Sequence, residues 1–318
     1  MADSTHDSIG LMLDGKLDDV EISAFLTGLN QRGFTKTDIL GAAKAMRERM
    51  TVFEGAQDAV DVCGTGGDRH GTLNVSTAVG FVLASGGVRV VKHGNRAVSS
   101  QSGSTDVLTA LGIKTDVAPA VMQKALSETN FCYLAAPLYH PSMKRVAEIR
   151  KKIGRTIFNL LGPLANPARV KKQLVGVFDA GYVKTFAEIL KELGSTQAII
   201  VHGKDGLDEA TTTMATDLAE LKNGAIETRA INASDFGLPA ATLKDLQGGS
   251  ADYNAKRLKQ ALQGEKGPYT DIIRLNAGLG FAVAHNEDIA GGVARATKLL
   301  ENGTPAETLA RFARLTHE

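Results

Sequence analysis

An alternation of short apolar runs with helical patterns, beginning near residue 56, limits the possible folds of this chain more than any other feature. The apolar runs are strand-sized and lie at Ala59–Cys63, Val88–Val91, Phe131–Ala135, Leu174–Phe178 and Ala198–Val201. Helical spacing fills the intervals at Ser76–Ser85, at Thr105–Leu111, from Pro141 onward and at Thr185–Leu193. Such a pattern is typical of a mostly parallel sheet covered by helices on both faces. The sequence therefore predicts an α/β domain with a mostly parallel central sheet.

The amino-terminal part of the chain lacks strand patterns. Residues 8–50 carry apolar side chains at helical spacing, and Thr35-Lys36-Thr37-Asp38 begins a new helix. We therefore expect a small all-helical domain at 1–55 and a large α/β domain at 56–318. Helices from about 141–168 are expected to join the small domain.

The last part of the chain predicts a hairpin followed by helices. Leu218–Leu221 and Ile226–Ile231 are separated by Asn223-Gly224, a pair that favours the tight turn of a hairpin. From Ala251 to Glu318 the pattern is helical.

Two glycine-rich stretches follow neighbouring apolar runs. Val62–Asp68 leads through Asn74–Thr77 into a helix, and Lys92–Arg96 leads through Ser102-Gly103-Ser104 into the next one. Glycines allow the backbone to approach an anion closely, and helix amino ends present free N–H groups to it. Ordinary tight turns are the alternative, but two hydroxyl-rich loops, one of them with a lysine, favour a phosphate-rich ligand. Both loops leave the carboxyl ends of predicted strands, the ligand-binding edge of an open parallel sheet.

An acidic loop follows the predicted strand Ala198–Val201. Its sequence is Gly206-Leu207-Asp208-Glu209, with two adjacent carboxylates. Mg²⁺ prefers oxygen ligands and often bridges protein carboxylates and substrate phosphates. A solvated acidic loop is the alternative. Because the pair is expected to face two phosphate-type loops, we favour a magnesium site.

The helix predicted from Pro141 carries an arginine on its apolar side. At 100° per residue, Arg150 falls within an arc formed by Met143, Val146, Ala147, Ile149 and Ile153. Five other charged residues occupy the opposite face. An unpaired charge on an apolar face is costly, so a snorkelling side chain, a structural ion pair or an anion-binding role must explain it. We favour anion binding. His140, just before the helix, is a weaker candidate because a histidine there often serves as a cap.

The segment 155–167, in contrast, is apolar and broken by Gly162-Pro163 and Asn166-Pro167. It predicts a helix with its stop signal, and it is equally compatible with a pocket lid or a hinge between domains.

Composition excludes several classes of function. The net charge of +1 gives no reason to expect a nucleic-acid partner. No apolar run approaches the ~18 residues of a membrane helix, and Met1–Ser4 shows no secretory signal. Cys63 and Cys132 lie in strand-like runs, which favours buried thiols and a cytoplasmic location.

Taken together, these motifs resemble the anthranilate phosphoribosyltransferase family. The matching segments appear in the family's order over nearly the whole chain, and they are Gly64–Asp68 with Asn74–Thr77, Lys92–Arg96 with Ser102-Gly103-Ser104, His140-Pro141 with Arg150, Thr156–Leu164, Gly206–Glu209, and Gly248–Ala251 before Asn254-Ala255. The resemblance implies a helical small domain over an α/β domain, and a homodimer formed through the small domains. It also implies Mg²⁺-dependent transfer of the phosphoribosyl group of PRPP to anthranilate, with release of pyrophosphate, in tryptophan biosynthesis.

The resemblance also implies roles for individual residues. PRPP would be held by Gly64, Thr65, Gly66, Gly67, Asp68, Thr72, Asn74, Ser76, Thr77, Lys92 and Ser104. Anthranilate would contact Gly64, His93, Asn95, His140, Arg150 and Gly162. Ser76, Asp208 and Glu209 would reach the metal, and Lys92, Asn95 and Arg150 would carry the catalytic roles.

Three positions depart from the family pattern. Arg69 replaces a usual glycine, Leu73 replaces a usual phenylalanine, and the chain is one residue shorter between Arg150 and Thr156. Two rival functions share the expected architecture: a pyrimidine nucleoside phosphorylase and a nucleic-acid-binding paralogue. The first usually has Lys-His-Ser where this chain has Lys92-His93-Gly94, and the near-neutral charge argues against the second.

Overall fold

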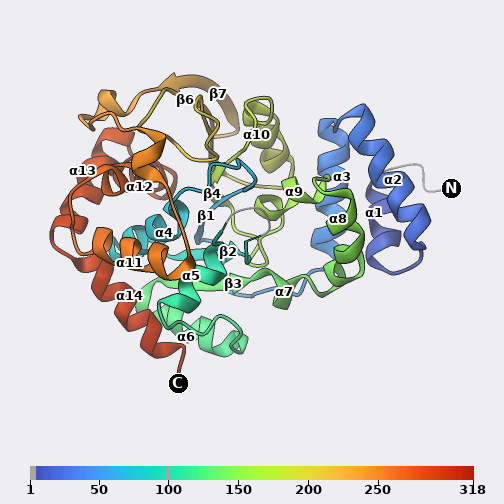
Figure 1. The fold of residues 1–318 in the computed structure, drawn as a ribbon, viewed down its shortest axis with the longest axis horizontal. Coiled ribbons are helices and arrows are strands. Elements are labelled where there is room, and N and C mark those ends of the chain that lie inside the picture. Colours follow the sequence, from blue (N-terminus) through green and yellow to red (C-terminus); the bar gives the residue numbers. More distant parts are fainter. Residues whose placement is uncertain (1–4, 98–100) are drawn as a thin grey trace.

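The computed structural model describes residues 5–97 and 101–318, and it shows a helical bundle beside a larger α/β unit (Figure 1). Residues 1–4, on which the expectation of no secretory signal rests, lie outside the described residues. The bundle comprises α1 (Thr5–Leu13), α2 (Asp19–Arg32) and α3 (Lys36–Glu48). Capping boxes at Asp18 and Thr35 begin α2 and α3, which satisfies backbone N–H groups that a helix start leaves unpaired. The predicted small helical domain is confirmed.

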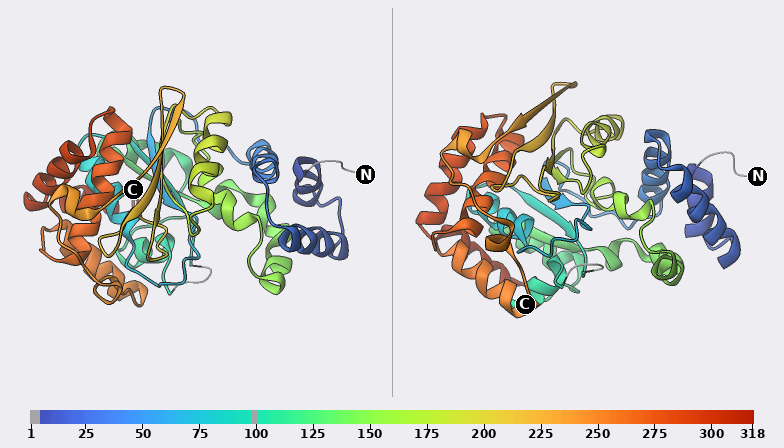
Figure 2. Two further views of the ribbon diagram at one scale, coloured as in Figure 1. Left: turned by 90° about the horizontal axis from the view of Figure 1, so that it is seen from above. Right: turned by 45° about the horizontal axis from the view of Figure 1, so that its top comes forward.

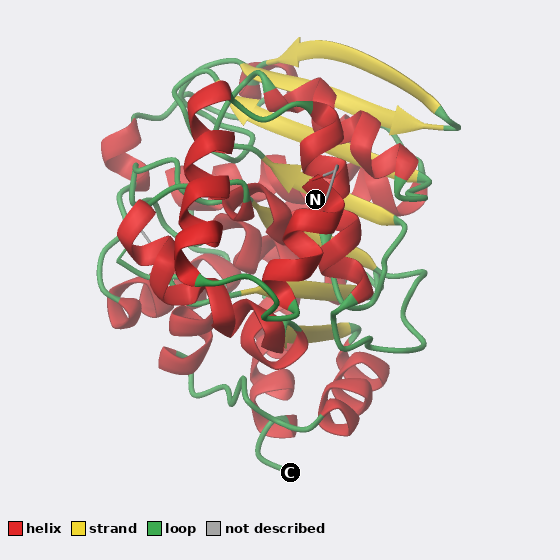
Figure 3. Cartoon of the chain, turned by 90° about the vertical axis from the view of Figure 1, so that its right-hand side faces the viewer, coloured by secondary structure: helices red, strands yellow, loops and turns green. Residues whose placement is uncertain are grey.

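A seven-stranded sheet forms the centre of the α/β unit (Figure 3). Its strands are β1 (Val60–Gly64), β2 (Val90–Gly94), β3 (Phe131–Ala135), β4 (Lys172–Gly176), β5 (Gln197–Gly203), β6 (Thr216–Lys222) and β7 (Ala225–Ile231). The spatial order is β3-β2-β1-β4-β5-β6-β7; the first five strands are parallel, and β6 and β7 are antiparallel. The predicted hairpin is present, and positive φ angles of 53° at Asn223 and 76° at Gly224 form its turn. The prediction of a mostly parallel sheet is confirmed.

Helices cover both faces of the sheet (Figure 2). On one face lie α4 (Val75–Ser85) and α12 (Pro268–His285), and α10 (Tyr182–Glu192) lies on the other. Strand side chains alternate between these layers: Ile199 and Val201 belong to the core under α4 and α12, whereas Ala198 and Ile200 pack with α10. The second core also contains apolar residues of the small domain, so the bundle packs onto the α10 side.

The remaining helices complete the two layers. They are α5 (Ser104–Ala110), α6 (Pro119–Thr129), α7 (Ala136–Tyr139), α8 (Ala147–Ile153), α9 (Phe158–Leu161), α11 (Ala251–Leu262), α13 (Ile289–Glu301) and α14 (Thr304–Leu315). Short 3-10 turns occur at Pro141–Val146, Gly162–Leu164, Ala233–Phe236 and Leu243–Leu246. None of the helices in the described part of the chain has the length and apolarity needed to cross a membrane.

Several predicted boundaries were wrong. The single helix expected from Pro141 is a 3-10 turn that continues into α8 from Ala147. Strand β2 begins at Val90 rather than Val88, because the chain after α4 first turns at Gly87, where φ is 86°. Lys92 therefore lies inside the strand rather than in the loop after it. Helix α6 was not predicted.

Candidate active site

Loops from the five parallel strands meet at the carboxyl edge of the sheet. The loop after β5 crosses to the loop after β1, where Asp208 Oδ2 accepts a hydrogen bond from the Gly66 N–H at 2.7 Å. Glycine is required beneath this crossing, because a Cβ at Gly64 would lie 2.3 Å from Asp208 Oδ2 and one at Gly176 would lie 1.6 Å from the Asp208 carbonyl oxygen. The acidic loop and the first glycine-rich loop are thus brought together, as the sequence predicted.

The two carboxylates of the acidic loop are half-buried beside the amino end of α4. Glu209 Oε1 accepts a hydrogen bond from the Ser76 N–H at 3.2 Å. Burial and the nearby Asp68 raise the pKa of Asp208 to about 7. Burial and the charge of Asp208 raise the pKa of Glu209 well above its usual value. Two adjacent, half-buried carboxylates that disfavour ionisation form a site that a cation would stabilise.

The oxygen atoms of the acidic pair and of Ser76 suit magnesium. Asp208, Glu209 and the Ser76 hydroxyl offer only oxygen atoms, the ligands that Mg²⁺ prefers. Among the described residues, no group of three or more His, Cys, Asp or Glu side chains could hold a metal ion. The protein therefore supplies part of a coordination shell, and water or substrate oxygens would have to complete it.

Lys92 provides the positive charge on the same side of the sheet. Its side chain is buried, and Nζ donates to the Val62 carbonyl at 2.6 Å and to Ser76 Oγ at 3.0 Å. Burial lowers the pKa of Lys92, while the neighbouring Asp61 carboxyl opposes that shift. Ser76 thus connects the lysine with the acidic pair.

Hydrogen bonds fix the polar side chains around this centre. Asn74 Nδ2 donates to the Ser102 carbonyl at 3.1 Å, and Asn74 Oδ1 accepts from Asn254 Nδ2 at 3.0 Å. Ser104 Oγ lies 2.9 Å from the hydroxyl of Tyr133 on β3, which also bonds Thr105. Tyr133 was not among the site residues predicted from the sequence, although a tyrosine within an apolar strand signals a hydroxyl that needs a partner.

The other phosphate-side candidates also lie at this edge. Gly64 ends β1, and Thr65, Gly66, Gly67 and Asp68 follow it, with Thr65 Oγ1 accepting from the Phe178 N–H at 3.0 Å. Thr72 forms an isolated antiparallel bridge with Gln247. Thr77 is 1% exposed within α4. Its hydroxyl could therefore contact a ligand only after a small rearrangement, and otherwise only its backbone could do so.

A second, less charged half of the site lies on the opposite face of β2. Successive strand residues point to opposite faces, so His93 points away from Lys92 and its Nδ1 lies 3.3 Å from the Gly162 carbonyl. The ring centroids of His93 and His140 are 5.0 Å apart. Burial lowers the pKa of His93 to about 3 and that of His140 to about 4, so both imidazoles are neutral at pH 7. Asn95 is exposed just beyond the end of β2.

Arg150 lies in the last turn of α8, and its guanidinium has no hydrogen-bond partner in the part of the chain that the structure describes. Its Nε is buried without a hydrogen bond, and no ion pair to Arg150 exists among residues 5–97 and 101–318. The guanidinium carbon lies 5.3 Å from the centroid of the Phe158 ring. Burial lowers the pKa of Arg150. A structural ion pair is therefore excluded within the described residues, which leaves a snorkelling side chain or an anion-binding group.

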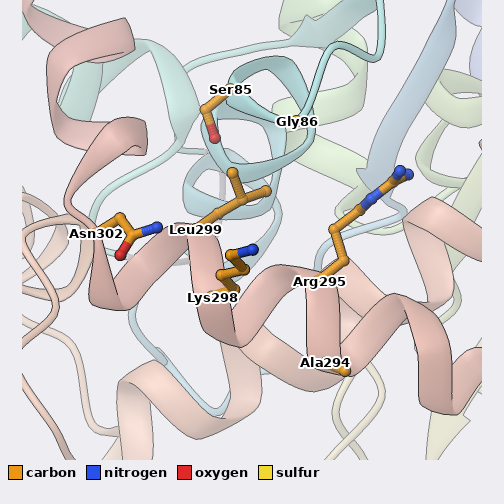
Figure 4. A pocket seen from close by; sticks show the side chains of 7 residues that line it. All are labelled: Ser85, Gly86, Ala294, Arg295, Lys298, Leu299 and Asn302. Carbon is orange, nitrogen blue, oxygen red and sulfur yellow. The ribbon is translucent and has the colours of Figure 1, made fainter.

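A separate hollow of about 590 Å³ lies at the other end of α4 (Figure 4). Ser85 and Gly86 form one wall, and α13 contributes Arg295 and Lys298. Helix α4 has 11 residues, so at about 1.5 Å per residue this hollow is roughly 16 Å from the acidic pair. It is not part of the candidate active site.

Comparisons with known proteins match both parts of the chain. The family model described as the glycosyl transferase family, a/b domain, matches residues 56–306, and the helical bundle domain model of the same family matches residues 2–50. An anthranilate phosphoribosyltransferase from Azorhizobium caulinodans is 44% identical over 307 residues, which cover 96% of this chain and 89% of that protein.

Two solved structures resemble the whole chain. The crystal structure of anthranilate phosphoribosyltransferase from Thermus thermophilus has a TM-score of 0.93 and 36% identity, and covers 99% of this chain and 95% of that one. The Saccharomyces cerevisiae enzyme in complex with PRPP and Mg has a TM-score of 0.90 and 28% identity, and covers 98% of this chain and 92% of that one.

Proposed function

Since the chain belongs to the anthranilate phosphoribosyltransferases within this glycosyl transferase family, we propose that the strand-edge site is where it transfers the phosphoribosyl group of PRPP to anthranilate. This reaction releases pyrophosphate and serves tryptophan biosynthesis. One observation supports the location above all: β2 directs Lys92 toward Ser76 and the acidic pair, and it directs His93 toward the Gly162 carbonyl on the opposite face. PRPP, a polyanion, would suit the half with Lys92, and anthranilate, a planar aromatic acid, would suit the half with His93.

The phosphate half holds the leaving group in this proposal. Departure of pyrophosphate leaves an oxocarbenium-like ribosyl centre, so the main requirement is to stabilise negative charge on the leaving group. In this proposal Lys92 and the loop 64–68 would face that charge. Asn74 and Ser104, both fixed by hydrogen bonds, would orient the ribosyl and phosphate oxygens.

Asp208, Glu209 and Ser76 would hold Mg²⁺, which supplies charge neutralisation for the pyrophosphate when it is bound. The yeast relative has been solved with PRPP and Mg. The raised pKa values of the two carboxyls in this chain support the assignment, because a bound cation would stabilise their ionised forms.

The second half would orient anthranilate. Arg150 offers a planar guanidinium with unused donors, which can pair with a carboxylate and stack on an aromatic ring. His93 and His140 would form neutral walls, and Gly162 leaves room beside them, because a Cβ at this position would meet no other residue within 4 Å. In this proposal Asn95, just beyond β2, and Gly64, at the end of β1, would lie between the halves, where the amine meets the ribosyl carbon. An aromatic amine is already neutral at pH 7, so positioning rather than a strong general base is required.

We also propose the division into a small domain at 1–55, joined by helices from about 141–168, and a large domain at 56–318. Contacts of α2 with α8 and of α3 with α9 support it. A homodimer through the small domains is proposed as well, supported by an exposed fraction of 76% at Val20 on α2. The buried thiols of Cys63 and Cys132 suit a cytoplasmic location.

The direct test follows the fluorescence of anthranilate during incubation with the enzyme and Mg²⁺. We expect the signal to fall only when PRPP is present. Phosphorolysis of a pyrimidine nucleoside without loss of anthranilate would contradict the proposal. A salt-sensitive mobility shift of DNA or RNA, again without turnover of anthranilate, would favour the nucleic-acid-binding alternative.

A further inference from the structure

Arg155 connects three parts of the molecule that are far apart in sequence. Its Nη2 donates a hydrogen bond to the Gly67 carbonyl in the loop after β1. Its guanidinium carbon lies 4.0 Å from the ring centroid of Phe178, just after β4. Its own carbonyl accepts a hydrogen bond at 2.8 Å from Asn30 Nδ2 on α2 of the small domain.

These contacts are directed at the proposed PRPP loop from two sides. Arg155 holds the loop at Gly67, and Phe178, on which the guanidinium stacks, donates its N–H to Thr65 Oγ1 in the same loop at 3.0 Å. The fit at Gly67 is close, because a Cβ there would lie 2.8 Å from Arg155 Nη2. Movement of the loop would therefore have to move Arg155.

The same residue is attached to the helix that carries Arg150. Helix α8 ends at Ile153, and the Gly154 N–H donates to the Arg150 carbonyl at 2.8 Å. Gly154 has a φ of 86°, a value that glycine adopts without strain, and Arg155 follows at once. Only this one turn separates the group that contacts the PRPP loop from the group proposed to bind anthranilate. Figure 1 shows α8 beside α1 and α2.

We propose that Arg155 is a positioning residue that couples the two substrate sites, so that an occupied PRPP loop strengthens the binding of anthranilate at Arg150. This inference rests on the proposed function of the site. The stacked and hydrogen-bonded guanidinium transmits the position of the loop to the end of α8. Asn30 anchors the backbone of Arg155 to the small domain while the side chain follows the loop.

The experiment titrates anthranilate into the full-length enzyme by calorimetry, with and without saturating Mg²⁺ and inorganic pyrophosphate. We expect pyrophosphate to tighten anthranilate binding about fivefold or more in the wild type, the usual lower range of coupling between sites. The ratio should fall to about one in Arg155→Ala and recover partly in Arg155→Lys. Lys152→Ala, which removes the same charge from the exposed side of α8, should keep the wild-type ratio.

Three results would overturn the inference. One is an unchanged ratio in Arg155→Ala. Another is a wild-type ratio of one in an enzyme that still consumes anthranilate with PRPP, which would leave the proposed function intact. The third is weaker pyrophosphate binding in Arg155→Ala with the ratio retained, which would make Arg155 a phosphate ligand only. Absence of PRPP-dependent turnover in the wild type would instead refute the proposed function. Melting curves of all variants identify any loss of the fold.

Discussion

Replacing Arg150 with methionine should stabilise the free protein and weaken anthranilate binding. Methionine keeps most of the apolar stem of the side chain but removes a cation that has no hydrogen-bond or ion-pair partner among the described residues. A buried donor without a hydrogen bond costs about 1–3 kcal/mol. The guanidinium carbon lies 5.3 Å from the centroid of the Phe158 ring, and this cation–π contact offsets about 0.5–1 kcal/mol of that cost. We expect the free energy of unfolding to rise by about 1 kcal/mol.

The loss on the substrate side follows from the same group. A hydrogen bond to a charged partner contributes about 1.5–3 kcal/mol, and each 1.4 kcal/mol is a factor of ten in affinity. The KM for anthranilate should therefore rise about 10- to 150-fold, whereas the KM for PRPP should stay within about twofold. Steady-state kinetics with each substrate varied in turn, beside urea unfolding curves, measure both effects. Arg150→Ala should show the same difference between the two KM values.

Arg47 supplies the control. It is also partly buried, but its Nε donates to the Leu164 carbonyl at 2.6 Å and its Nη1 to the Leu193 carbonyl at 3.4 Å. Arg47→Met should destabilise the fold by about 1–3 kcal/mol, because it leaves two buried carbonyls unpaired, and should spare both KM values if the protein stays folded. The reasoning about Arg150 is refuted if Arg150→Met behaves like Arg47→Met, or if it leaves the KM for anthranilate unchanged.

Four further outcomes can be measured directly. The double variant Asp208→Asn, Glu209→Gln should abolish turnover at limiting Mg²⁺ while remaining folded by circular dichroism. The folded-state pKa of Asp208 is raised to about 7, so the native state binds more protons than the unfolded state between about pH 4 and 7. The free energy of unfolding of the metal-free wild type should therefore fall as the pH rises through that window. The fall should be smaller in the double variant. Lys92→Ala should lower kcat/KM for PRPP by about 100-fold or more, yet leave binding of anthranilate alone unchanged in calorimetry. Val20→Asp should convert the expected homodimer to a monomer in light scattering; a wild-type monomer would contradict the proposed interface.

The fold was predictable from the sequence because its strongest signals are local. Apolar runs that alternate with amphipathic helices predict a parallel sheet, and Asn223-Gly224 predicts the hairpin turn. The boundary errors arose where local signals conflict. Val88 is apolar enough to begin a strand, but the turn at Gly86-Gly87 delays β2 by two residues, so that Lys92 is a strand residue.

The candidate site was predictable only in part. Loop residues at strand ends can be read from sequence, because topology brings those ends together. Contacts such as Asp208 with Gly66, 142 residues apart, and Arg155 with Gly67, 88 residues apart, have no local signal. The structure also explains one departure from the family pattern. Arg69 has a φ of 66°, which glycine adopts more easily. The backbone at Arg69 therefore has a conformation typical of glycine, which destabilises the fold by about 1 kcal/mol with an arginine there.

The charges on the phosphate side indicate the order in which this half must be filled. Desolvation and neighbouring carboxyls raise the pKa values of the half-buried Asp208 and Glu209, and burial lowers the pKa of Lys92. A cation alone would relieve the carboxylates but repel the lysine, and a polyanion alone would do the reverse. Magnesium bound together with PRPP would satisfy both at once, since the substrate phosphates would supply oxygen ligands to the metal and negative charge to Lys92. Binding of Mg²⁺ and PRPP should therefore be mutually dependent, with little affinity of the acidic pair for the metal alone.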